Sequence, residues 1–142
     1  MTQGAGPGTA VDRVAPIFII ADNDQRAVAG ITMSLGSQWF YIPVSHGDDV
    51  VRYAKEFTTT GIFLAEQLPC PEGFGGIEHL LQVLLDEVGK PVIILSELWN
   101  QDLVRRWKQL GAEDCIPHPT RTDERLNIMK RKMRELILAQ AG

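Results

Sequence analysis

IFIIADND, residues 17–24, decides the fold, because five apolar residues run directly into three polar ones. A continuous apolar run of this length is typical of a strand covered on both faces, as in a parallel sheet. The segment that follows places Val28, Ile31 and Leu35 at helical spacing before Gly36 stops it. The stretch therefore predicts a strand–helix unit whose strand ends in polar, mainly acidic side chains.

The same unit recurs along the rest of the chain. Further strands are expected at residues 39–44, 61–65, 91–95 and 114–116, and helices after Asp48 or Asp49, over 77–88, over 101–110 and over 121–139. Pro43 lacks an N–H and therefore favours an edge position for its strand. Strict alternation predicts an α/β fold, a doubly wound sheet of five parallel strands flanked by five helices.

Composition limits the class of protein. The 142 residues suit one domain, expected at residues 16–142 behind a flexible tail at residues 1–15. A formal net charge of −4 argues against nucleic-acid binding by the whole surface, and we expect no direct DNA binding. The chain has neither a membrane-spanning apolar run nor a secretory signal, which predicts a cytoplasmic protein without membrane contact.

Polar side chains stand where the predicted strands end. These are Asp22, Asn23, Asp24, Glu66, Ser96 and His118. The carboxyl ends of parallel strands meet at one edge of the sheet, where α/β proteins place their functional groups. The sequence therefore predicts a polar site at this edge.

This order of strands and strand-end residues resembles the receiver domain of two-component response regulators over about residues 16–139. Three short segments add to the resemblance: HGDD at 46–49, GIE at 76–78 and GAED at 111–114. The resemblance implies a flavodoxin-like receiver fold and a role in bacterial-type phosphorelay signalling.

In that family an acidic pair binds Mg²⁺, an Asp accepts a phosphoryl group, and a Ser or Thr and a Lys contact the phosphate. By position, Asp22 and Asn23 match the acidic pair, with Asp24 just beyond it. The other matches are Glu66 at the phosphoacceptor, Ser96 at the hydroxyl, His118 at the Lys and Cys115 at the switching aromatic residue.

Four of these positions depart from the family pattern. The extra methylene of Glu66 moves the nucleophilic oxygen by about 1 Å, a misplacement that can cost about 10²-fold in rate. Asn23 removes one negative charge from the metal site, and His118 replaces an ammonium by an imidazole. Cys115 has no ring to swing, and the loop after Glu66, with Pro71 displaced, is longer than usual. We therefore expect a degenerate receiver without efficient phosphoryl acceptance.

Three questions about these residues stay open at this point. Glu66 either imitates the phosphorylated state or is a solvated strand-end residue. Asp22 and Glu66 either hold Mg²⁺ weakly, the one cofactor considered, or bind no metal; for Asp24 we favour a place at a helix N-terminus. His118 either pairs with Glu66 or Asp22, or is exposed beside its proline, which we favour.

A partner surface is expected on the predicted helix at 101–110. Trp107, Arg105 and Arg106 are of the residue types enriched in interface hot spots, although the helical spacing of Trp107 equally fits core packing. The resemblance implies a histidine kinase or downstream effector as partner. A homodimer through the fourth and fifth predicted helices is a further expectation.

We therefore predict a stand-alone degenerate receiver domain that acts as a protein-interaction module in two-component signalling. One alternative is a functional phosphoacceptor. Another is a nucleotide-messenger module that uses the basic fourth and fifth helices. An enzyme is not expected, because the chain shows neither an activated nucleophile–base pair nor a glycine-rich phosphate loop.

Overall fold

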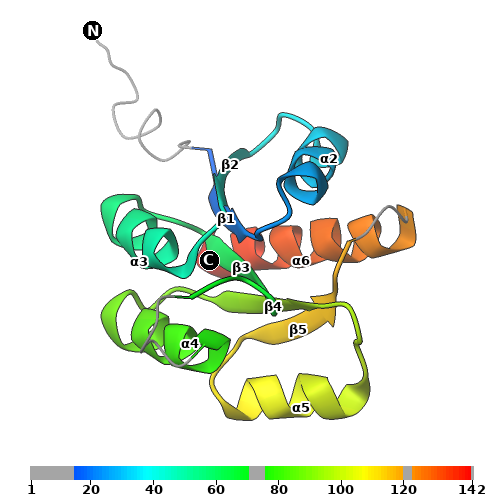
Figure 1. Ribbon diagram of the computed structural model, residues 1–142. Coiled ribbons are helices and arrows are strands. Elements are labelled where there is room, and N and C mark those ends of the chain that lie inside the picture. Colours follow the sequence, from blue (N-terminus) through cyan, green and yellow to red (C-terminus); the bar gives the residue numbers. More distant parts are fainter. Residues whose placement is uncertain (1–14, 71–75, 120–122, 142) are drawn as a thin grey trace, which may run out of the picture.

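Ten elements alternate along the chain in the computed structural model, which describes residues 15–70, 76–119 and 123–141 (Figure 1). The strands are β1 (Ile17–Ala21), β2 (Phe40–Val44), β3 (Gly61–Ala65), β4 (Val92–Ser96) and β5 (Asp114–Pro117). The helices are α2 (Gln25–Leu35), α3 (Gly47–Glu56), α4 (Gly76–Glu87), α5 (Gln101–Gln109) and α6 (Asp123–Ala141). The predicted α/β fold with five strands and five helices is confirmed.

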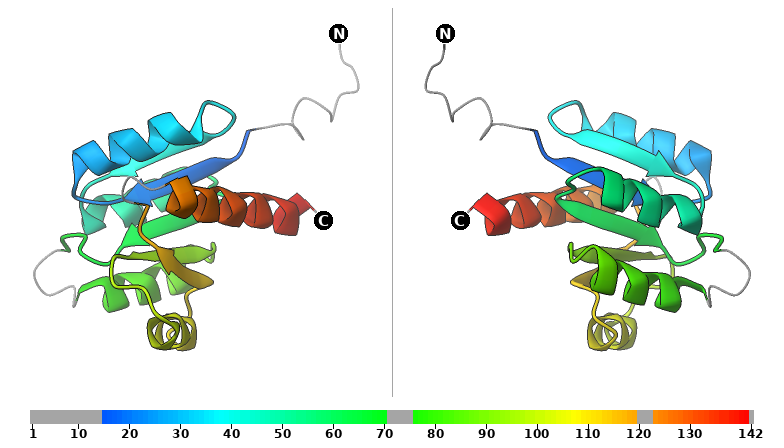
Figure 2. Two further views of the ribbon diagram at one scale, coloured as in Figure 1. Left: turned by 90° about the vertical axis from the view of Figure 1, so that its right-hand side faces the viewer. Right: turned by 90° about the vertical axis from the view of Figure 1, so that its left-hand side faces the viewer.

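The strands form one parallel sheet in the order β2-β1-β3-β4-β5. β2 is an edge strand, as Pro43 predicted, and Pro43 is exposed there opposite Ile20. Helices α2 and α6 cover one face of the sheet, and α3, α4 and α5 cover the other (Figure 2). Both faces are therefore buried, which explains the continuous apolar runs.

Side chains of β1 and β3 alternate between the two cores. Phe18, Ile20 and Phe63 pack with α2 and α6, whereas Ile19 and Leu64 pack with α3, α4 and α5. Most side chains of these strands are fully buried. This alternation fixes the direction in which side chains leave the strand ends.

Some local details differ from the sequence prediction. His46, rather than Asp48 or Asp49, caps α3, because its extended backbone lets its Nδ1 accept the Asp48 N–H at 3.3 Å. Gly111 has φ of +111°, and a Cβ there would lie 2.3 Å from Leu85 Cδ1.

The predicted tail up to residue 14, Pro71 and residues 121–122 of the last predicted helix lie outside the described residues. None of the described helices is both long and apolar enough to span a bilayer.

Candidate functional site

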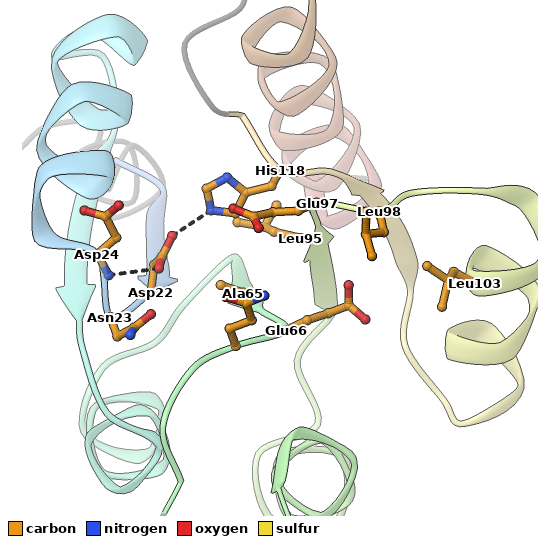
Figure 3. A pocket seen from close by; sticks show the side chains of 11 residues that line it. Asp22, Asn23, Asp24, Ala65, Glu66, Leu95, Glu97, Leu98, Leu103 and His118 are labelled. Carbon is orange, nitrogen blue, oxygen red and sulfur yellow. Dashed lines mark hydrogen bonds and ion pairs between the residues drawn. The ribbon is translucent and has the colours of Figure 1, made fainter.

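A cavity of about 570 Å³ opens at the carboxyl ends of the strands (Figure 3). Its lining residues are Asp22, Asn23, Asp24, Ala65, Glu66, Gln67, Leu95, Glu97, Leu98, Leu103 and His118. The strand-end residues expected to meet at this edge thus do so, except Ser96, which is fully buried and does not line the cavity. The Ser96 hydroxyl has no hydrogen-bond partner among the described residues.

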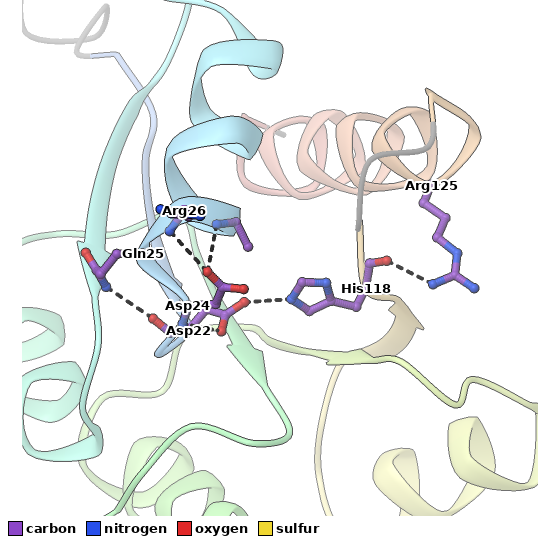
Figure 4. Close-up of polar contacts among 7 residues, drawn as sticks. Asp22, Asp24, Gln25, Arg26, His118 and Arg125 are labelled. Carbon is purple, nitrogen blue, oxygen red and sulfur yellow. Dashed lines mark hydrogen bonds and ion pairs between the residues drawn. The ribbon is translucent and has the colours of Figure 1, made fainter.

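Asp22 and His118 form a buried pair between the ends of β1 and β5 (Figure 4). His118 Nε2 lies 2.6 Å from Asp22 Oδ2, and the two side chains are only 5% and 6% exposed. An ionised carboxylate only accepts hydrogen bonds, so Nε2 carries the proton of this contact. Of the two pairings left open for His118, the structure shows the one with Asp22.

The favoured expectation of an exposed His118 is therefore wrong. Its backbone N–H donates to the Ser96 carbonyl at 2.8 Å, so the sheet contact with β4 continues one residue beyond β5. Pro119, the neighbour that suggested a loop, is itself buried. The chain therefore turns away only after His118 and directs its imidazole inward.

Both oxygens of Asp22 are engaged. Oδ2 contacts His118, and Oδ1 accepts the backbone N–H of Asp24 at 3.0 Å. Burial alone would raise the pKa of Asp22, but the hydrogen bonds from His118 and from the Asp24 backbone, with the attraction of His118, lower it below its usual value. Asp22 is therefore ionised at neutral pH.

Asp24 serves the helix that follows β1. Its Oδ1 accepts the backbone N–H groups of Arg26 and Ala27, both at 3.1 Å, so it is the N-cap of α2. This is the role favoured from the sequence. Asn23 is exposed at the rim, and its side chain makes no hydrogen bond within the described residues.

Glu66 faces α5 rather than Asp22. It follows β3 in phase with Leu64, whose side chain packs on the α3, α4 and α5 side. Its Oε2 accepts a hydrogen bond from the indole Nε1 of Trp107 at 3.3 Å. In Figure 3 the carboxylate points toward Leu98 and Leu103 and away from Asp22. The sequence did not foresee this contact, which joins residues 41 positions apart.

These residues do not fit the Mg²⁺ ion that the fold suggests. Asp22 has both oxygens engaged, Asn23 is neutral, and Glu66 points elsewhere. Across the described part of the chain, no three His, Cys, Asp or Glu side chains are grouped so as to hold a metal. The expectation of a metal held by Asp22 and Glu66 therefore finds no support in this geometry.

The predicted partner residues on α5 divide into two groups. Trp107 is only 5% exposed and packs in the core, so of the two roles left open for it the structure shows core packing. Leu103, four residues earlier, gave the helical spacing that indicated the core. Arg105 and Arg106 are exposed, and each pairs with a carboxylate, Asp102 and Glu78 respectively.

Cys115, at the position of the switching aromatic, is buried in β5. Burial, together with the negative charges of Glu66 and Asp114, raises the pKa of its thiol to about 12. The thiol is therefore protonated and acts as a small apolar core residue.

Sequence reasoning missed two residues of the cavity rim, Glu97 and Leu98. Both directly follow Ser96, so the strand-end rule that identified Ser96 could have found them. Leu98 is 81% exposed, and Glu97 is also exposed. They add one charge and one apolar side chain to the rim.

Comparison with known proteins gives matches among solved structures alone, since no family model and no curated protein matches the chain. The receiver domain of the Francisella response regulator 1452 aligns with a TM-score of 0.74 at 17% identity, over 88% of this chain and 98% of that one. The chain has the receiver fold. A signal receiver domain from Vibrio parahaemolyticus aligns at TM-score 0.72 and 18% identity, over 89% of this chain and 96% of its own.

A two-component response regulator from Clostridium difficile aligns at TM-score 0.71 and 14% identity, covering 89% of this chain and 99% of that one. At such identities the likeness concerns the fold.

Proposed function

We propose that this chain is a degenerate receiver module of two-component signalling that acts by protein contact and does not accept a phosphoryl group at Glu66. One observation carries the proposal. Both oxygens of Asp22 are occupied by His118 and the Asp24 backbone, while Glu66 is turned to Trp107. Phosphoryl transfer requires nucleophile, cation and donors to converge on one point, and here they are separated.

The charge of the cavity supports the same proposal. Asp22, Asp24, Glu66 and Glu97 all line it, and none of the lysines or arginines that the structure describes does. A phosphoryl group carries about −1.5 to −2 charges at neutral pH. An incoming phosphodonor would meet repulsion that a lysine or a bound cation would otherwise offset.

Of the two roles left open for Glu66, imitation of the phosphorylated state by its negative charge is better supported than a solvated strand-end residue without a role. Its hydrogen bond from Trp107 links the end of β3 to α5, and Trp107 is buried in the core. A fixed carboxylate therefore holds α5 without any covalent modification. We infer that α5 keeps one position and that its surface is permanently available to a partner such as a histidine kinase or an effector.

The remaining parts of the proposal follow the fold. We place the receiver-like domain at residues 16–142 and expect it in the cytoplasm, where two-component receivers act. A homodimer through α5 and α6 belongs to the same proposal. No observation favours nucleotide-messenger binding, because Arg105 and Arg106 are each paired with a carboxylate.

Incubation with acetyl phosphate and Mg²⁺, followed by intact mass spectrometry, tests the proposal. We expect no species heavier by about 80 Da, the mass of one phosphoryl group, under conditions that label a competent receiver domain. A wild-type adduct mapped to Glu66 would overturn the proposal.

A matched variant sharpens this experiment. The triple variant Asn23→Asp, Glu66→Asp and His118→Lys restores the residue types that the resemblance implies. Because a lysine at 118 leaves Asp22 free for a cation, we expect this variant to gain the adduct. If the folded variant stays unlabelled, these three residues do not by themselves account for the loss of phosphoryl acceptance.

A further inference from the structure

One wall of the cavity is apolar, and of its side chains Leu98 faces solvent, Leu103 is half-buried and Leu95 is buried. The residues beside Leu98 are held in place, because the Trp99 indole N–H donates to the Cys115 carbonyl at 2.8 Å and the Asn100 side chain accepts the Leu103 N–H at 2.9 Å. Leu98 is thus kept 81% exposed at the mouth of a cavity, where an apolar side chain is a feature of binding sites.

The rim beside this wall is negative and only partly compensated. Glu97 is exposed and makes no hydrogen bond or ion pair with any part of the chain that the structure describes. Glu66 uses one oxygen for Trp107, and Figure 3 places its carboxylate beside Leu98 and Leu103. Asp22 is engaged by His118, and Asp24 lies beyond Asp22 in Figure 3, so the charge beside this wall that a ligand can reach lies at Glu66 and Glu97.

We propose that this cavity docks a segment of a partner protein that inserts an arginine next to an apolar side chain. The proposal rests on the proposed function, because it takes the cavity as closed to phosphoryl chemistry. Charge complementarity selects the occupant: a guanidinium presents five donors in a planar fork that suits carboxylates, whereas phosphates and nucleic acids are repelled.

The size and polarity of the site agree with this occupant. A cavity of about 570 Å³ lies within the range of about 300–1,000 Å³ typical of ligand pockets. An arginine reaching Glu66 and Glu97 would bring the apolar side chain next to it against Leu98 and Leu103. Arginine and apolar anchors are enriched in the centres of protein interfaces.

Titration of the ¹⁵N-labelled protein with acetyl-leucyl-arginine amide tests the proposal by NMR. We expect saturable shifts of the Glu66, Glu97 and Leu98 amides. Acetyl-leucyl-citrulline amide, which has the same shape without the charge, should bind at least about tenfold more weakly, because a charged pair is worth more than a neutral hydrogen bond. Equal shifts with both peptides, or none at the cavity up to 20 mM (about twenty times a 1 mM Kd), would overturn the proposal.

Two variants locate the binding. Glu97→Gln should weaken binding of the arginine peptide about fivefold, whereas Glu113→Gln, an exposed glutamate outside the cavity, should leave it unchanged. Leu98→Ser, which removes an exposed side chain, should weaken it without affecting the fold. Equal effects of the two Glu→Gln variants would contradict the assigned site.

Failure of the docking site and failure of the proposed function give different experimental results. A phosphoryl adduct on the wild-type protein overturns the proposed function whatever the peptide does. Failure of the peptide to bind, with no adduct formed, overturns the docking site alone.

Discussion

The two halves of the cavity use the same residue types in opposite ways. In the buried half, Asp22 and His118, from the ends of β1 and β5, are almost completely buried and hydrogen-bond to each other, while His118 Nδ1 has no partner among the described residues. In the open half, Glu66 at the end of β3 is half-buried with one partner, and Glu97 at the end of β4 is exposed with none described. Burial and available partners, rather than residue type, therefore decide that one carboxylate is engaged within the fold while another is left exposed to solvent.

The largest effect is expected from breaking the buried half. Asp22→Ala leaves His118 buried without its partner, and removing one member of such a pair costs about 3 kcal/mol of unfolding free energy. Urea denaturation at pH 7 measures this loss. Asp24→Ala, the matched control, removes only the cap of α2 and should cost about 1 kcal/mol. Equal losses of unfolding free energy in the two variants would mean that the buried pair stabilises the fold no more than the helix cap does.

Lowering the pH should weaken the contribution of Asp22, in the buried half, to the stability of the fold. The pKa of Asp22 is lowered in the folded protein, so its stabilising contribution is present above the unfolded value of about 3.9 and is lost as pH falls through the lower folded value. Asp22→Asn lacks this titration. The difference in unfolding free energy between wild type and variant should therefore shrink below about pH 4. Parallel curves from pH 2 to pH 5 would argue against an ionised Asp22.

The hydrogen bond that joins Glu66, in the open half, to Trp107 of α5 should stabilise the fold less than the Asp22–His118 pair does. In a double-mutant cycle of Glu66→Gln and Trp107→Phe, we expect a coupling of about 0.5–1 kcal/mol, because one partly buried hydrogen bond is lost. Hydrogen exchange in α5 should increase in both single variants. A cycle of Glu97→Gln with Trp107→Phe is the control and should show no coupling, since Glu97 has no described contact with Trp107.

The smallest effect is expected on the exposed face of α5. Arg105→Ala and Arg106→Ala each break a solvent-exposed ion pair, with Asp102 and Glu78, and should change the unfolding free energy by less than about 0.5 kcal/mol. Thermal unfolding at low and high salt checks this. A loss above about 1 kcal/mol in either variant would show that this face also belongs to the stabilising part of the molecule.

The sheet was predictable because burial on both faces leaves continuous apolar runs in the sequence. IFIIA and GIFLA contain apolar residues and one glycine, and Pro43 correctly placed β2 at the edge. The cap of α3 was missed because Asp48 and Asp49 are the more usual capping residues, and only the extended backbone of His46 decides the matter.

The gathering of polar residues was also predictable, but their pairing was not. Parallel strands bring Asp22 and His118 to one edge although they lie 96 positions apart in the chain. Whether His118 turns inward depends on how far the β4–β5 contact continues, and no local pattern records this. For Trp107, the helical spacing allowed core or interface, and the packing of α5 on the sheet decided for the core.

Titration of the ¹⁵N-labelled protein with Mg²⁺, followed at the Asp22, Asp24 and Glu66 amides and at the His118 ring nitrogens, tests most directly whether the buried half is sealed. We expect Nε2 of His118 to carry its proton throughout, and the three amides to stay unshifted at low millimolar Mg²⁺. Saturable shifts of these amides, together with loss of the Nε2–H signal, would show that the metal displaces His118 from Asp22 and would contradict a sealed site.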